Sequence, residues 1–131
     1  MKILVVGYGS IGKRHVNNLL KIPNIEIIIY THRSDIDNEI KNKCRIFKSL
    51  NDCIDEKPVA SIISNVTSLH IEIALKLASA GLHLFIEKGI TDLLFDKKFK
   101  NMMNENGQKF LKSFVNCGKS SQKLAKILDN F

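Results

Sequence analysis

The chain has 131 residues, of which 44% are hydrophobic and 25% are charged, and its formal net charge is +7. This length supplies one domain with one hydrophobic core, and this composition excludes a disordered polyelectrolyte. No apolar run approaches the roughly 20 residues of a transmembrane helix, and the apolar start at residues 2–6 is too short for a signal peptide. We therefore expect a soluble, cytoplasmic protein with no membrane partner.

Short apolar runs alternate with segments of helical periodicity along the chain. The expected strands are residues 2–6, 25–30, 44–47, 59–64, 83–86 and 109–115. The expected helices run from the glycine loop to Leu20 and over residues 35–42, 49–56, 68–80, 92–106 and 119–130. Strands that alternate with helices at this spacing predict right-handed βαβ units. The expected fold is α/β, a three-layer αβα sandwich with a doubly wound parallel sheet.

Two of these helices carry more specific expectations. Ser34 is the expected N-cap of the helix at 35–42, and Gly81 is the expected C′ residue of the helix at 68–80. The second helix is also apolar over a broad arc. Its apolar residues are Leu69, Ile71, Ile73, Leu75, Leu77 and Ala78.

The positive charge is concentrated toward the carboxyl end, where residues 96–131 carry 8 lysines and 3 acidic residues. A basic segment can attract nucleic acid, so a basic interaction protein is one hypothesis. However, Lys97, Lys98 and Lys100 alternate with apolar residues at helical spacing, which is typical of the solvated face of a helix. The segment also lacks aromatic residues interleaved with arginine, as single-strand binding favours. We therefore expect no nucleic-acid partner.

The chain has 3 cysteines, Cys44, Cys53 and Cys117, without a C-x-x-C spacing. An odd number without paired spacing indicates neither a disulfide framework nor a zinc site. We therefore expect no metal.

The segment Gly7-Tyr8-Gly9-Ser10-Ile11-Gly12 fits the pattern G-x-G-x-x-G, between the first expected strand and the first expected helix. In that context the pattern is typical of dinucleotide binding, and we expect all six residues to contact the cofactor. Gly7 permits the tight turn, Gly9 lets a pyrophosphate approach the backbone, and Gly12 lets the helix pack closely. The helix N-terminus then offers free N–H groups to the phosphates. The alternative is a glycine-rich turn without a ligand.

The end of the second expected strand is where a dinucleotide site contacts the adenosine ribose. His32, Arg33 and Ser34 lie there, and the first carboxylate is Asp35. A carboxylate at this place binds the 2′-hydroxyl of NAD, whereas an arginine accommodates the 2′-phosphate of NADP. Arg33 and Ser34 could hold a phosphate by charge-assisted hydrogen bonds. These residues therefore favour NADP(H) over NAD(H), although NAD(H) stays an alternative. Arg33 can also be interpreted as an ordinary exposed arginine of a loop.

Two further motifs resemble one family. Residues 64–70 (Ser-Asn-Val-Thr-Ser-Leu-His) end a strand and open a helix, and Glu87-Lys88-Gly89 follows the next strand. Together with the glycine loop and the Gly-Lys-Arg-His segment that ends at His15, they resemble the N-terminal domain of the Gfo/Idh/MocA oxidoreductases. The similarity covers about residues 1–107. It implies a Rossmann NAD(P)-binding domain over residues 1–118, followed at residues 119–131 by the first helix of a second domain.

The resemblance implies hydride transfer between a nicotinamide and a carbinol carbon of a sugar-like or cyclitol-like substrate. It implies that Lys88 is the catalytic residue, contacting the substrate hydroxyl in a proton relay while Glu87 orients it. The expected cofactor contacts on the nicotinamide side are Asn65, Val66, His70, Glu87 and Lys88. His15 and His83 are expected to be structural or exposed.

The sequence departs from the family at three places. Val66 and Gly89 stand where the family has prolines, which removes a fixed φ beside two expected site residues. The family enzymes also continue into a second α/β domain that forms the substrate floor, and 131 residues barely reach it. The expected function is thus a short or truncated oxidoreductase, completed by a second copy or another chain. The alternative is a dinucleotide-binding module without catalysis.

Overall fold

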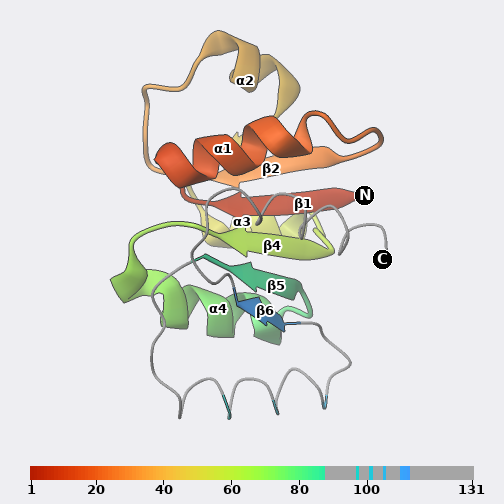
Figure 1. Cartoon of the computed structure of the whole chain (residues 1–131), viewed down its shortest axis with the longest axis vertical. Coiled ribbons are helices and arrows are strands. Elements are labelled where there is room, and N and C mark those ends of the chain that lie inside the picture. The colour runs from red at the N-terminus through yellow and green to blue at the C-terminus, as the bar shows by residue number, and fades with distance from the viewer. Residues whose placement is uncertain (88–96, 98–100, 102–104, 106–109, 113–131) are drawn as a thin grey trace.

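Figure 1 presents a computed structural model of the chain, which describes residues 1–87, 97, 101, 105 and 110–112. Six described strands form one parallel sheet in the order β3-β2-β1-β4-β5-β6. The strands are β1 (Lys2–Val6), β2 (Glu26–Tyr30), β3 (Arg45–Phe47), β4 (Ala60–Ile63), β5 (His83–Ile86) and β6 (Phe110–Lys112). Each lies within its predicted range. The order reverses between β1 and β4, as in a doubly wound sheet.

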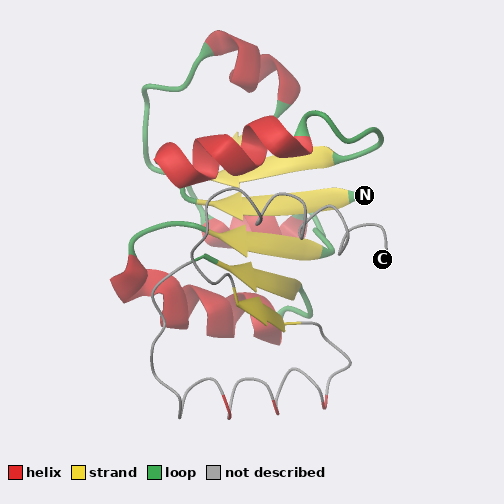
Figure 2. Cartoon of the chain, viewed as in Figure 1, coloured by secondary structure: helices red, strands yellow, loops and turns green. Residues whose placement is uncertain are grey.

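Helices cover both faces of this sheet, which gives the three layers visible in Figure 2. The described helices are α1 (Ser10–Leu19), α2 (Asn38–Lys43), α3 (Leu50–Asp55), the 3-10 turn η1 (Thr67–Leu69) and α4 (His70–Ser79). α1 and α2 contribute to the core on one face, and α3 and α4 to the core on the other. The predicted αβα sandwich is therefore confirmed. None of the helices in this part of the chain is long and apolar enough to cross a membrane.

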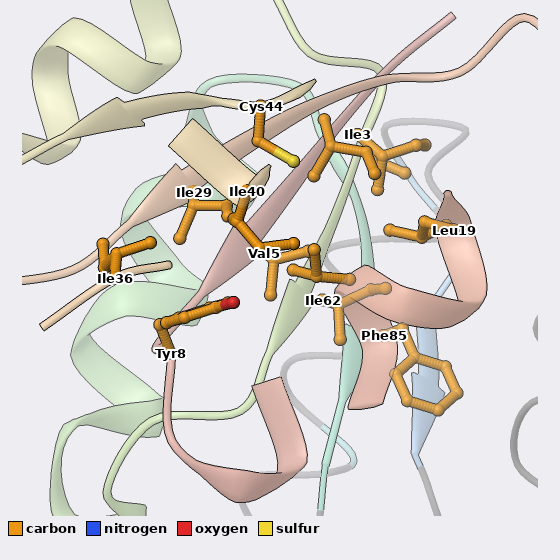
Figure 3. Close-up of a cluster of buried hydrophobic side chains, with 13 residues drawn as sticks. Ile3, Val5, Tyr8, Leu19, Ile29, Ile36, Ile40, Cys44, Ile62 and Phe85 are labelled. Carbon is orange, nitrogen blue, oxygen red and sulfur yellow. The ribbon is translucent and has the colours of Figure 1, made fainter. Parts of the chain in front are cut away.

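Alternating residues of the strands fill the two cores. Val5 is in register with Ile29 of β2 and with Ile62 of β4, and all three are buried in one cluster. Figure 3 shows these three side chains together with Leu19 of α1 and Ile40 of α2. The buried apolar runs of β1, β2 and β4 thus reflect strands that are covered on both faces, as a parallel sheet requires.

The helix predicted at 35–42 begins three residues later than expected, and Ser34 does not cap it. Asp37 occupies the N-cap position of α2, and its side chain makes no capping hydrogen bond. Serine and aspartate both favour the N-cap position, so the sequence offers two candidates. Asp37 has an extended ψ of 141°, and its carbonyl accepts the first helical hydrogen bonds, from Ile40 N–H and Lys41 N–H at 3.1 Å.

The helix predicted at 68–80 divides into η1 and α4, and its buried face is narrower than the predicted arc. Leu69, Ile71 and Leu75 are 39% to 44% exposed. The buried residues of α4 are His70, Ile73, Ala74, Leu77 and Ala78. Ile71 and Leu75 are each two positions from a buried residue, which places them on the opposite side of the helix. The apolar arc of the sequence is therefore broader than the buried face of the helix.

The predicted stop of this helix is correct. Gly81 has φ +89° and follows Ala80, the C-cap residue of α4, and its N–H donates to Ala78 O at 2.9 Å. Leu82 N–H donates to Leu77 O at 3.1 Å. These two bonds satisfy carbonyls that the end of a helix leaves free, and a glycine adopts this left-handed conformation without a Cβ penalty.

The predicted helix at 119–130 and the segment 119–131 assigned to a second domain lie outside the described residues. The same applies to most of the helix predicted at 92–106, of which residues 97, 101 and 105 are described as helical.

Candidate dinucleotide-binding site

The loops after β1, β2 and β4 line a pocket of about 440 Å³. The register explains the pocket, because Val6 pairs with Tyr30 and with Ile63, so the three strands end at one level of the sheet. Its lining residues are Gly7, Tyr8, Gly9, Ser10, Ile11, Tyr30, Thr31, His32, Arg33, Ser64, Asn65, Val66, Leu69 and Ile73. The pocket thus lies at the carboxyl ends of the strands, beside the reversal of strand order, where open α/β sheets bind ligands.

The N-terminus of α1 opens toward this pocket without a side-chain cap. Gly9 is its N-cap residue and has no side chain to donate or accept, and the first turn contains no acidic residue. Lys13 is the first residue whose N–H bonds back into the helix, to Gly9 O at 2.9 Å. By contrast, Ser49 caps α3 by accepting from Asp52 N–H at 3.4 Å. The amides at the start of α1 and the positive end of its dipole suit an anion such as phosphate.

The three glycines of the loop meet different surroundings. Gly7 has φ +91°, and a Cβ there would lie 2.8 Å from Asn65 Cα. A Cβ at Gly12 would clash with Gly7 O. A Cβ at Gly9 would meet no atom within 4 Å and would stand in the open pocket. Gly7 and Gly12 are therefore required by packing, whereas the space at Gly9 is available to a ligand.

Ser64 fastens the glycine loop to the end of β4. Its hydroxyl donates to Val6 O at 3.0 Å and lies 3.3 Å from Gly7 O. Ser64 also lines the pocket, a position not expected from the sequence. The sequence carries one signal for this role: the Ser64 hydroxyl follows the four buried residues of β4, and a polar group at such a place needs a hydrogen-bond partner.

Tyr8 lines the pocket but belongs mainly to the hydrophobic core. Its side chain is 3% exposed and lies in the same cluster as Ile36 and Ile40. Burial raises the pKa of Tyr8, so its hydroxyl is neutral at physiological pH. The Lys13 Nζ lies 5.5 Å from the centre of the Tyr8 ring, which adds a cation–π contact.

At the end of β2, Arg33 makes a two-point ion pair with Asp35. The Arg33 Nε donates to Asp35 Oδ1 at 2.8 Å and its Nη2 to Asp35 Oδ2 at 2.5 Å. The hydrogen bond from the guanidinium lowers the pKa of the Asp35 carboxyl to about 2. On the same loop, His32 Nε2 lies 3.2 Å from the Tyr30 hydroxyl. His32 and Arg33 line the pocket as predicted, and their contact with a cofactor stays a prediction.

His70 lies behind the pocket rather than on its wall. It is 1% exposed, and its Nε2 donates to Asn65 O at 2.6 Å. Asn65 and Val66 line the pocket, and Val66 is 63% exposed. The hydrogen bond places the proton of the ring on Nε2, because a carbonyl oxygen only accepts. His70 therefore holds the loop that carries Asn65, and its expected contact with the nicotinamide stays a prediction.

Glu87 pairs with His15, a residue expected from the sequence to be structural or exposed. The His15 Nε2 lies 2.6 Å from the Glu87 Oε1, and the side chains are 2% and 13% exposed. Glu87 N–H also donates to Ile63 O at 2.9 Å, which continues the pairing of β5 with β4. The sequence carries one signal for this pair: His15 lies among the apolar residues of α1, and a buried imidazole needs a hydrogen-bond partner. Lys88, the predicted catalytic residue, lies outside the described residues.

The family model described as the oxidoreductase family with an NAD-binding Rossmann fold, GFO_IDH_MocA, matches residues 1–114. The chain belongs to the Gfo/Idh/MocA family. This membership confirms the resemblance carried by the glycine loop, by residues 64–70 and by Glu87-Lys88.

The Gfo/Idh/MocA proteins that the chain matches are much longer than the chain itself. A myo-inositol 2-dehydrogenase of Thermotoga maritima is 34% identical over 101 residues, which are 73% of this chain and 30% of that protein. The structure of a myo-inositol 2-dehydrogenase from Lactobacillus plantarum is 26% identical, with a TM-score of 0.75, and the match covers 99% of this chain and 41% of that one. The chain therefore spans less than half the length of these relatives.

A more distant structure supports the fold alone. It is a biliverdin reductase from Synechocystis, solved with biliverdin and NADP+, which is 18% identical with a TM-score of 0.77. The match covers 98% of this chain and 42% of that one.

Proposed function

We propose that the pocket at the ends of β1, β2 and β4 binds a nicotinamide dinucleotide and that the chain is the cofactor domain of an oxidoreductase. The observation that carries the proposal is the start of α1. Its amides are uncapped, and the neighbouring Gly9 leaves open space where any other residue would place a Cβ. Family membership supports the same ligand, because the family is described as NAD-binding.

The residues present fit such a cofactor. The amides of Ser10 and Ile11 would hold the pyrophosphate, and His32 and Arg33 would face the adenosine ribose. Asn65 and Val66 would line the path toward the nicotinamide. The bound cofactor would supply the hydride chemistry, and the protein supplies position and electrostatics.

The substrate class follows from the relatives and is a proposal for this chain. A myo-inositol 2-dehydrogenase acts on a cyclitol by its name, and we propose a sugar-like or cyclitol-like substrate whose carbinol oxygen exchanges a proton with Lys88. Glu87, held by His15, would orient this lysine. We further propose that additional protein, from a second copy or another chain, completes the substrate site. A cytoplasmic location also stays a prediction.

Calorimetric titration with NADH and NADPH tests cofactor binding. Gly9→Ala should weaken the affinity by about tenfold or more, because its methyl group occupies the space of the pyrophosphate. Asn17→Ala, on the exposed side of the same helix, is the matched control and should bind as the wild type does. The proposal is wrong if the wild type binds neither nucleotide, or if Gly9→Ala binds both normally.

A second experiment separates an oxidoreductase from a binding module without catalysis. The full chain is assayed for nucleotide reduction with a panel of sugars and cyclitols, in wild-type and Lys88→Ala forms. Loss of turnover in Lys88→Ala with unchanged nucleotide affinity supports the catalytic assignment. Equal, measurable rates in the two forms would remove Lys88 from the mechanism, and no turnover in either form with nucleotide binding intact would favour the binding module without catalysis.

A further inference from the structure

The imidazole of His15 in α1 contacts two side chains at the end of β5. It meets the Phe85 ring in a T-shaped contact with 5.7 Å between the ring centres, and its Nε2 lies 2.6 Å from Glu87 Oε1. Phe85 and Glu87 are two residues apart along an extended backbone, so their side chains point to the same face of the sheet. The Phe85 ring and the Glu87 carboxylate thus form a socket for His15.

This socket acts on the side of α1 that packs on the sheet. Gly12 and His15 are three residues apart and therefore share one side of the helix. The lack of a side chain at Gly12 permits the close approach of Gly7 O, which sets how near α1 lies to the glycine loop. A hydrogen bond depends on angle as well as distance, so the bond at His15 also fixes the rotation of α1 about its axis.

The position of His15 is transmitted to the phosphate-facing end of the helix. His15 follows Ser10, the first residue of α1, by about 7.5 Å along the helix axis. The helix is continuous over Ser10–Leu19, so a rotation or shift at His15 displaces the amides of Ser10 and Ile11. Neither His15 nor Glu87 lines the cofactor pocket, so their effect on a bound pyrophosphate passes through α1.

We propose that His15 and Glu87 are positioning residues for cofactor binding, because they hold α1 where its first amides meet the pyrophosphate. This inference rests on the proposed function. Their side chains are 2% and 13% exposed, and a hydrogen bond that is shielded from water is strong enough to fix a helix. NADH and NADPH share the pyrophosphate, so loss of the pair weakens both nucleotides by the same factor.

The test compares His15→Leu with His15→Gln. Leucine keeps an apolar side chain beside Phe85 but has no donor, whereas the amide of glutamine still donates a hydrogen bond. Calorimetry is performed where circular dichroism shows that each protein is folded, so that a loss of stability alone leaves the affinities unchanged. His15→Leu should weaken NADH and NADPH alike by about fivefold. His15→Gln, and the exposed control Asn17→Ala, should stay within about twofold of the wild type.

A second variant approaches the pair from the other partner. Glu87→Ala removes the acceptor and should weaken both nucleotides by a factor similar to that of His15→Leu. His15→Leu added to Glu87→Ala should have no further effect, because the bond is already lost. Additive losses, or a His15→Gln protein that binds as weakly as His15→Leu, overturn the inference while leaving nucleotide binding intact.

The amide resonances of Ser10 and Ile11 in the protein without nucleotide give a readout that does not depend on binding. They should move in Glu87→Ala and in His15→Leu, and stay closer to the wild-type positions in His15→Gln. Unmoved resonances in Glu87→Ala would show that the pair does not place the start of α1, and would overturn the inference alone. Failure of the wild type to bind either nucleotide overturns the proposed function and the role of the pair in binding.

Discussion

The Nε2 of His15 lies 2.6 Å from the Oε1 of Glu87 and joins the middle of α1 to the end of β5, 72 residues away. The His15 Nδ1 is buried and has no hydrogen-bond partner in the described part of the chain. The bond requires a proton on Nε2, because a carboxylate oxygen only accepts. His15 thus acts as a donor that fixes the direction of the Glu87 carboxylate.

The first prediction concerns this pair. His15→Ala removes the donor to Glu87 and leaves a cavity in the core, so it should lower the free energy of unfolding by about 3 kcal/mol. Urea denaturation followed by circular dichroism measures the change. Asn17→Ala, two residues along the same helix but exposed, should change the stability by less than about 0.5 kcal/mol. Equal effects of the two substitutions would show that the pair does not stabilise the fold.

The second prediction separates two glycines of one loop. Gly12→Ala places a methyl group against Gly7 O and should destabilise the protein by about 3 kcal/mol, because rigid backbone must move. Gly9→Ala, with open space around its Cβ and an extended backbone at ψ −165°, should cost less than about 0.5 kcal/mol. Thermal and urea unfolding of the two variants give the comparison. A Gly9→Ala protein as unstable as Gly12→Ala would contradict this division of roles.

The third prediction is the titration of Asp35. Its pKa is lowered from 3.8 to about 2, and the hydrogen bond from Arg33 is the largest cause. The pair therefore supports the folded state above about pH 4, and this support disappears as the pH falls through about 2. Side-chain carboxyl carbon shifts followed by NMR should show a midpoint near 2 in the wild type. In Arg33→Ala the midpoint should return toward 3.8, and an unmoved midpoint would assign the shift to another cause.

The fourth prediction concerns the thiol of Cys53, which is fully buried. Burial raises its pKa to about 12, so almost no thiolate exists at pH 8. Cys44 is also buried, and burial raises its pKa as well. In a Cys117→Ser background, the thiol reagent DTNB should therefore react slowly with the folded protein and rapidly in denaturant. Fast reaction without denaturant would mean that the sheet opens easily at α3.

The sequence was most informative where local pattern and burial agree. The continuous apolar runs of β1 and β5 predicted both strands with their observed bounds, because strands covered on two faces are apolar throughout. Gly81 predicted the end of α4, because a positive φ follows the helix there. The start of α2 was predicted wrongly, since Ser34 and Asp37 are both residue types that favour the N-cap position and the structure uses Asp37.

The candidate site was predictable to the extent that its residues are adjacent in sequence. Residues 7–11 line the pocket, as the glycine pattern indicated. Ser64 holds the glycine loop through a hydrogen bond from its hydroxyl to Val6 O, and His15 holds Glu87 through a hydrogen bond between their side chains. Contacts across 58 and 72 residues arise from strand order and register, which a local motif does not contain.

The hydroxyl of Ser64, bonded to Val6 O at the end of β1, has a consequence for the entropic cost of binding. Hydrogen bonds hold the glycine loop from both flanks: the Ser64 hydroxyl bonds on one side, and on the other Gly7 N–H donates to Tyr30 O at 2.9 Å. An arriving anion meets amides that already point the same way, so little backbone entropy is lost upon association.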